Sequence, residues 1–335
     1  MNPALETAAH PVLETAAFRV ASDPGIEIAV RNKHPAALRA FAPERTVIYL
    51  HGATYPAAAS FDLPLGGLSW MDYIAGRGYD VYLLDVRGYG ASTRPAAMDG
   101  PADHGTPFAH TEEAMRDLDA VVDFVCRRRG IDRVVLLAWS WGTAIAQWYA
   151  SRRPERVAGL ALYAPLWIRE TPSLVGAGAG PPGAYRTVTR AQAQARWLTG
   201  VPDERRADLI PPGWFDAWWT ATLATDAQGA RRDPPVLRAP NGVVADGRAY
   251  WGAGRIPWDP AAIRAPVLLV RGEWDCDTPG DMARNLFARL TGTRSKRLVE
   301  LGAGTHTLMM ETNRMHLFRE VQRFLDDDLR PTALS

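Results

Sequence analysis

The chain has 335 residues, of which 47% are apolar and 22% charged, and its formal net charge at pH 7 is +1. This balance is typical of a globular protein, and it excludes both a strongly basic nucleic-acid-binding protein and a highly charged disordered chain. A single hydrophobic core rarely grows beyond about 250–300 residues, so the length allows one large domain or two.

Apolar, β-rich runs alternate along the chain with longer helical runs. Several apolar runs, such as VIYL, VVLLA and VLLV, are nearly continuous, as expected for parallel strands buried on both faces. The expected strands are residues 16–22, 26–31, 46–50, 80–85, 134–138, 157–163, 267–271 and 295–300. The expected helices are residues 68–76, 111–129, 141–151, 281–290 and 314–325. This order predicts an α/β fold with a doubly wound, mostly parallel eight-stranded sheet.

The alternation breaks over residues 166–262, where glycine- and proline-rich connectors separate helix-like stretches. More than half of the 12 tryptophans fall in this part of the chain. They are Trp167, Trp197, Trp214, Trp218, Trp219, Trp251 and Trp258. A stretch this rich in Gly and Pro is a poor sheet core. We therefore predict a helical cap over residues 166–262, inserted into a core made of residues 1–165 and 263–335.

Composition also bears on cofactors and location. Two cysteines, Cys126 and Cys276, are too few for a disulfide framework or a zinc site. No apolar run reaches the ~18 residues of a transmembrane helix, and the N-terminal residues lack the basic and apolar regions of a secretory signal. We expect a cytoplasmic protein without a metal or organic cofactor and without a nucleic-acid or membrane partner.

The basic residues are almost all of one type. Only Lys33 and Lys296 are lysines among the 38 basic residues, and the rest are arginines. We attribute this bias mainly to codon usage. Arginine also binds carboxylates through two parallel hydrogen bonds, so one or two of these side chains could take part in chemistry.

The strongest local signal of function is the segment LLAWSWGT at residues 136–143. It joins an expected buried strand to an expected helix through a sharp turn at Ser140. This is the context of a nucleophile elbow, whose usual pattern is Gly-x-Ser-x-Gly, and Ala138 stands at the first glycine position. The helix N-terminus behind the serine favours developing negative charge. The alternative is a serine that only caps the helix.

A serine hydroxyl is a weak nucleophile, so it needs a base that is oriented by a carboxylate. Asp275 follows the expected strand VLLV, at the carboxyl end where parallel sheets bind ligands. His306 follows the glycine-rich loop GAGT and precedes the last expected helix. We predict Ser140, Asp275 and His306 as the catalytic residues and favour Asp275 over Asp277 and Glu273.

Acyl transfer also needs two N–H donors for the tetrahedral intermediate, an oxyanion hole. One is expected from Trp141, the residue after the nucleophile. The other is expected from Ala53, in the loop HGATYP after the strand TVIYL, where Gly52 permits close backbone approach. We expect His51 to brace this loop rather than act as a second base.

These motifs resemble the α/β-hydrolase superfamily. They are the HG pair at 51–52, the turn DVRGYGAS at 85–92, the Ser140 elbow and the turns that carry Asp275 and His306. The resemblance covers residues 46–165 and 257–324. It implies a mostly parallel sheet, a cap inserted after the strand ending near Tyr163, and a serine hydrolase. Serine at the elbow argues against haloalkane dehalogenases and epoxide hydrolases, which carry aspartate there.

The segments SWGT at 140–143 and PERV at 154–157 resemble the proline iminopeptidase branch. That branch typically has His-Gly-Gly-Pro in the oxyanion loop, whereas this chain has His-Gly-Ala-Thr. An aminopeptidase also needs carboxylates in the cap to hold the ammonium group of its substrate. The available ones are Glu170, Asp203, Glu204, Asp208 and Asp216.

The segment PPGWFDAWW suggests where the substrate binds. Its pairs Trp214/Trp218 and Phe215/Trp219 are spaced i,i+4, which places aromatic surface on adjacent faces of a helix. We expect Trp214, Trp218 and Trp219, with Tyr55 beside the oxyanion loop, to line an apolar pocket for a bulky apolar or aromatic substrate.

The function predicted from these motifs is hydrolysis of a carboxylic ester, with a small-molecule acyl substrate bound covalently to Ser140 in an acyl-enzyme. The same three residues also suit an aminopeptidase or amidase, a thioesterase, a C–C bond hydrolase or an acyltransferase. A third class of function is a non-catalytic binding protein with the hydrolase fold.

Overall fold

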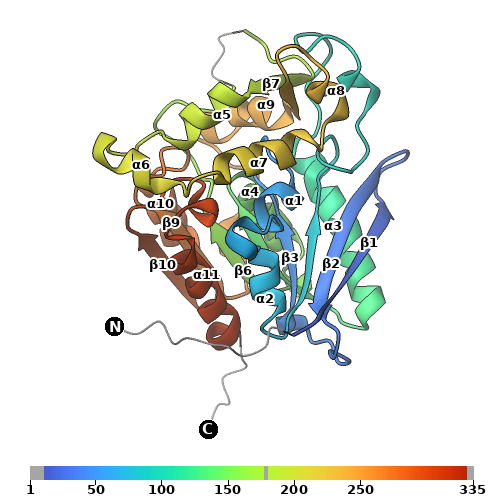
Figure 1. Cartoon of the computed structure of the whole chain (residues 1–335). Helices are drawn as coiled ribbons and strands as arrows, with labels where there is room; N and C mark the ends of the chain where they lie inside the picture. Colours follow the sequence, from blue (N-terminus) through green and yellow to red (C-terminus); the bar gives the residue numbers. More distant parts are fainter. Residues whose placement is uncertain (1–10, 177–179, 330–335) are drawn as a thin grey trace.

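The computed structural model describes residues 11–176 and 180–329 and centres on an eight-stranded sheet (Figure 1). Its strands are β1 Leu13–Ala21, β2 Glu27–Pro35, β3 Thr46–Leu50, β4 Asp80–Leu84, β5 Val134–Trp139, β6 Val157–Tyr163, β9 Val267–Gly272 and β10 Lys296–Leu301. Their order is β1-β2-β4-β3-β5-β6-β9-β10. The β1–β2 and β2–β4 pairs are antiparallel, and all the other pairs are parallel. The predicted fold class and each expected strand are therefore confirmed.

Helices cover both faces of the sheet because the central strands are apolar on both faces. In β3, Ile48 and Leu50 belong to the core under α3, α4 and α10, whereas Val47 and Tyr49 belong to the core under α1, α2 and α11. The bounds of these helices are α1 Ala57–Phe61, α2 Trp70–Ala75, α3 Thr111–Arg129, α4 Trp141–Arg152, α10 Gly280–Arg289 and α11 Arg314–Arg323. Among the described residues, no helix combines the length and the apolarity that crossing a bilayer requires.

The chain leaves the sheet after β6 and returns at its neighbour β9, with residues 166–262 between them. This segment carries the helices α5 Arg190–Trp197, α6 Arg206–Leu209, α7 Trp214–Leu223, α8 Ala227–Ala230 and α9 Gly242–Ala249. Figure 1 shows these elements gathered at one end of the sheet.

The same segment also contains two strands that the sequence analysis missed, β7 Tyr185–Thr189 and β8 Val236–Pro240, which pair antiparallel outside the main sheet. Each strand has a single partner, so Pro240 at the end of β8 interrupts no ladder. The buried pair Arg238 and Asp226, 2.7 Å apart, fixes β8 to the start of α8. A purely helical description of this segment is therefore incomplete.

The junction between β5 and α4 requires a glycine. A Cβ atom added at Gly142 would lie 2.6 Å from the carbonyl oxygen of His51 and 2.7 Å from that of Leu50. Both contacts are with backbone at the end of β3, which cannot move without disturbing the sheet. The first turn of α4 therefore lies directly against the loop that follows β3.

We expect Gly142→Ala to lower the free energy of unfolding by about 1–3 kcal/mol, because the new methyl group overpacks against backbone. Urea denaturation measures this change. Gly100→Ala is the control, since a Cβ at Gly100 meets no atom within 4 Å. Equal stability of the two variants would show that the close approach is absent in solution.

Candidate active site

Ser140 occupies the sharp turn between β5 and α4, with φ 55° and ψ −121°. A non-glycine residue rarely adopts a positive φ, and such strain costs about 1–3 kcal/mol, so the surrounding structure has to hold it. The amide of Ser140 donates to the carbonyl of Tyr163 at 3.0 Å, and the amide of Thr143 donates to the carbonyl of Ser140 at 2.9 Å. The predicted strand–turn–helix context of Ser140 is therefore present.

The turn brings Ser140 to His306 and Asp275. The Oγ atom of Ser140 lies 2.8 Å from Nε2 of His306. On the other side of the ring, Nδ1 of His306 lies 2.9 Å and 3.0 Å from the two carboxylate oxygens of Asp275. The three side chains follow β5, β9 and β10, and all three residues are buried. The structure thus joins the three predicted residues in one hydrogen-bonded chain.

The loop after β9 orients Asp275. Its Oδ1 accepts hydrogen bonds from the amides of Asp277 and Thr278, each at 2.9 Å, and its Oδ2 accepts one from the Thr278 hydroxyl at 2.7 Å. Asp277 instead forms two hydrogen bonds with Arg196, at 2.8 and 3.1 Å. The preference for Asp275 over Asp277 as the partner of His306 agrees with this geometry.

The backbone of His306 is held by side chains that the sequence analysis did not single out. Its carbonyl oxygen accepts from Trp139 Nε1 at 2.9 Å and from the Tyr163 hydroxyl at 2.8 Å. Both residues stand at the ends of apolar strands, where they look like ordinary core residues. Their polar atoms find this acceptor only because the fold places the ends of β5 and β6 next to the loop after β10.

A buried carboxylate, that of Glu311, binds the residues on either side of His306. It accepts from the Thr305 amide at 3.1 Å, from the hydroxyls of Thr305 and Thr307, and from Trp197 Nε1 at 3.0 Å. The last bond ties the loop to α5 in the 166–262 segment. The only signal in the sequence was an acidic residue directly after the apolar run LMM.

Burial and nearby charges shift the pKa values of His306 and Glu311. Burial opposes the protonation of His306, but the carboxylates of Asp275 and Asp277 outweigh it and raise its pKa above the ordinary value. Burial raises the pKa of Glu311 to about 7, against the opposing effect of its hydrogen bonds from Thr305, Trp197 and Thr307.

The expected oxyanion donors lie beside the serine. Trp141 is the first residue of α4, where an amide has no partner within the helix, and the amide of Ala53 has no backbone acceptor among the described residues. A Cβ at Gly52 would lie 2.9 Å from Cβ of Ser140, so glycine permits the close approach. His51 braces the loop as expected: its Nδ1 donates to the Gly52 carbonyl at 2.7 Å, and its Nε2 accepts from the Val86 amide at 3.0 Å.

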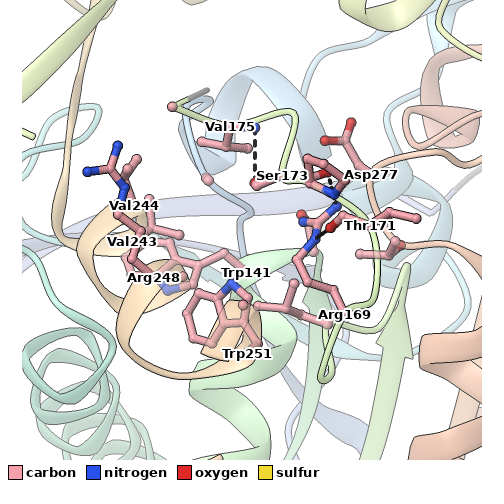
Figure 2. A pocket seen from close by; sticks show the side chains of 18 of the residues that line it. Trp141, Arg169, Thr171, Ser173, Val175, Val243, Val244, Arg248, Trp251 and Asp277 are labelled. Carbon is pink, nitrogen blue, oxygen red and sulfur yellow. Dashed lines mark hydrogen bonds between the residues drawn. The ribbon is translucent and has the colours of Figure 1, made fainter. Parts of the chain in front are cut away.

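A cavity of about 530 Å³ opens in front of Ser140, and Ala53 and Trp141 also line it (Figure 2). Its other lining residues come mainly from the 166–262 segment. They include Leu166, Arg169, Arg196, Val243, Val244 and Trp251, together with Asp277 from the loop after β9.

The tryptophans expected to bind substrate do not line this cavity. Tyr55 and Trp218 line a second, small space of about 20 Å³ beside His306, and their rings pack edge-to-face with centroids 4.8 Å apart. Trp214 lies under the guanidinium of Arg314, and Trp219 packs against Trp218. Neither lines the large cavity, because their side of α7 faces the core rather than Ser140. The aromatic residues that do line it are Trp141 and Trp251.

The carboxylates considered for an aminopeptidase are also dispersed. Of the five, only Glu170 lines the large cavity. Asp203 pairs with Arg206, and Asp216 with Arg190. An ammonium group in the cavity would meet arginines as well as carboxylates. Within residues 11–176 and 180–329, no group of three His, Cys, Asp or Glu residues could hold a metal ion.

Comparisons with known proteins bear on the fold and the family. The model of the α/β hydrolase fold family matches residues 45–310. A putative non-heme chloroperoxidase from Synechocystis sp. is 26% identical over 67% of this chain and 75% of its own length. Human lipase member M is 26% identical over 44% of this chain and 35% of its own length. The fold resembles a serine hydrolase from the polyaromatic-hydrocarbon-degrading bacterium Cycloclasticus zankles, with a TM-score of 0.62, 13% identity and coverage of 96% and 100% of the two chains.

We expect Asp277→Asn to lower the pKa of His306, because it removes a carboxylate that favours the imidazolium and leaves the charge of Arg196 unopposed. An NMR titration of the ring nitrogens measures this pKa. Asp281→Asn is the control, since Asp281 is not among the main groups that shift the His306 pKa. An unchanged or higher pKa in Asp277→Asn would contradict this electrostatic arrangement.

We expect Glu311→Ala to lower the free energy of unfolding by about 2–5 kcal/mol, because the Trp197 and Thr305 donors lose their buried acceptor. Chemical denaturation measures the loss. Glu204→Ala removes an exposed carboxylate and should change the stability by no more than about 0.5 kcal/mol. Similar values for both variants would argue against an anchoring role for Glu311.

Proposed function

The chain belongs to the α/β hydrolase fold family and is a hydrolase, and we propose that it cleaves a carboxylic ester through an acyl-enzyme on Ser140. The observation that carries this proposal is the hydrogen-bonded chain from Ser140 Oγ through His306 to Asp275. A serine that merely capped α4 would turn its hydroxyl toward the helix, whereas Ser140 makes no side-chain cap bond.

In the first half of the proposed reaction, Ser140 Oγ attacks the ester carbonyl carbon while Nε2 of His306 takes its proton. Asp275 holds Nδ1 and stabilises the imidazolium. The amides of Ala53 and Trp141 donate to the oxyanion of the tetrahedral intermediate. When the intermediate collapses, the C–O bond to the alcohol breaks and the alcohol leaves with the proton from Nε2.

In the second half, water attacks the acyl-enzyme carbonyl and gives a proton to Nε2. Collapse of this second intermediate breaks the bond to Ser140 Oγ, which recovers the proton, and the carboxylic acid leaves.

Neutral His306 is required at the start of each half, so the raised pKa of His306 predicts that activity falls as the pH drops toward and below that pKa.

The surroundings of Ser140 support a bulky substrate. The cavity of about 530 Å³ is within the range of small-molecule sites, and Trp141, Trp251 and several aliphatic side chains form part of its lining. We propose that residues 166–262 act as a cap, since most of the lining comes from this segment.

We expect Ser140→Ala and His306→Ala to lower kcat for 4-nitrophenyl butanoate by about 10⁴-fold or more, because each removes a member of one catalytic unit. Ser151→Ala, whose hydroxyl bonds only to the carbonyl of Trp148, is the control. Release of 4-nitrophenol in a stopped-flow instrument measures kcat and any initial burst. Full activity of Ser140→Ala would refute the mechanism.

The nucleophile can be identified without knowing the substrate. A fluorophosphonate should form a bond between its phosphorus and Ser140 Oγ with loss of fluoride, and peptide mass spectrometry locates the adduct. Absence of an adduct at Ser140 in the folded protein would favour a non-catalytic binding protein.

A further inference from the structure

The cavity in front of Ser140 has two chemically different sides (Figure 2). Trp141 and Trp251 lie together on one side, where the exposed Arg248 also stands and donates to the carbonyl of Gly180, whereas Arg169 and Asp277 lie on the other. The apolar side accounts for a hydrophobic substrate. The charged side is unexplained by hydrolysis of a neutral ester, because none of the proposed steps uses an arginine.

Two arginines stand on the charged side, and only one of them is neutralised. Arg196 binds the carboxylate of Asp277 through two nitrogens, at 2.8 and 3.1 Å. This bidentate geometry cancels the charges of both residues. The remaining carboxylate in the lining, Glu170, is exposed and forms no ion pair with either arginine.

Arg169 has no carboxylate partner within 4.0 Å among residues 11–176 and 180–329. Its Nε donates to the carbonyl of Thr171 at 2.6 Å, and one terminal nitrogen donates to the carbonyl of Pro172 at 2.8 Å. The other terminal nitrogen, Nη1, donates to no described residue. These two carbonyl oxygens orient the guanidinium of Arg169. Because both are neutral, they do not cancel its positive charge, which remains at the cavity.

Partial burial destabilises the positive charge of Arg169, because the guanidinium has lost some of its hydrating water. Loss of water around Arg169 lowers its pKa from the ordinary value, although a guanidinium remains protonated in proteins. An anion placed against Nη1 would replace the missing water and form a charge-assisted hydrogen bond. A carboxylate suits this position because its oxygens accept strongly and its charge opposes that of arginine.

We propose that the substrate is an amphipathic ester that carries a carboxylate, and that Arg169 binds this carboxylate while Trp141 and Trp251 contact the apolar part. This inference rests on the proposed ester hydrolysis at Ser140 and adds the class of substrate. Arg169 then selects anionic esters over neutral esters of the same shape.

The first test compares kcat/KM for mono-4-nitrophenyl glutarate with that for its neutral methyl ester, which places the carboxylate on the acyl side. A second pair, 4-carboxyphenyl pentanoate and phenyl pentanoate, places it on the alcohol side. We expect the anionic member of one pair to be preferred by about 10- to 100-fold at low salt. The preference should shrink as salt is added.

The matched variants are Arg169→Gln and Arg190→Gln. Arg190 is an exposed arginine of α5 that pairs with Asp216 and lines neither cavity beside Ser140. We expect the ratio of anionic to neutral kcat/KM to fall to about 1 in Arg169→Gln and to persist in Arg190→Gln. Equal rates for both members of both pairs in the unmodified protein, or an unchanged ratio in Arg169→Gln, would overturn the proposal.

Binding to Ser140→Ala separates this inference from the proposed reaction. Isothermal titration calorimetry measures the binding of glutarate and of its neutral diamide. We expect glutarate to bind at least tenfold more tightly, and this advantage to disappear when Arg169→Gln is added. If no ester is hydrolysed but this difference is found, the reaction is wrong and the anion site stands. If esters are hydrolysed through Ser140 but glutarate and the diamide bind equally, the anion site is wrong.

Discussion

The hydrogen bond between Ser140 Oγ and His306 Nε2 is the contact on which the candidate site depends. It joins loops that follow β5 and β10, which are separated in the sheet by β6 and β9. The loops meet because parallel strands end at the same edge, where their connections can converge. Other hydrogen bonds hold His306 in this position. Asp275 binds its ring, and Trp139 and Tyr163 bind its carbonyl oxygen. Glu311 binds the neighbouring residues of the same loop.

The hydrogen-bonded chain brings several charged side chains together in a buried part of the molecule. Asp275 and Asp277 raise the pKa of His306, and the positive charge of Arg196, which pairs with Asp277, partly offsets them. The Asp277–Arg196 pair thus links the loop after β9 to α5 and adjusts the electrostatics of the histidine. Arg169 lies in the same field without a carboxylate of its own, and for this reason a substrate anion is its natural partner.

Most of the fold was predictable because its signals are local. The apolar runs at β3, β5 and β9 identify buried strands, and the end of α3 is set by Gly130 with φ 67°. The strands β7 and β8 were missed because a single pairing between short, glycine- and proline-flanked runs leaves no periodic pattern. The position of the α7 tryptophans relative to the cavity could not be predicted from the sequence for a related reason. Helical spacing shows that Trp214 and Trp218 share a face, but it does not show what that face contacts.

The sequence by itself determined the order of the strands in the main sheet along the chain, the elbow at Ser140, the loop of Ala53, and the succession of Ser140, Asp275 and His306. Each of these follows from neighbouring residues or from position after a strand. Only the tertiary structure decided that Asp277 pairs with Arg196, that Glu311 and Trp197 secure this loop, and that Arg169 shares a cavity with Ser140. These facts depend on contacts between residues far apart in the chain. The sequence does not show whether an arginine faces solvent, a carboxylate or a cavity. Only the tertiary packing around the side chain decides which of these environments it has.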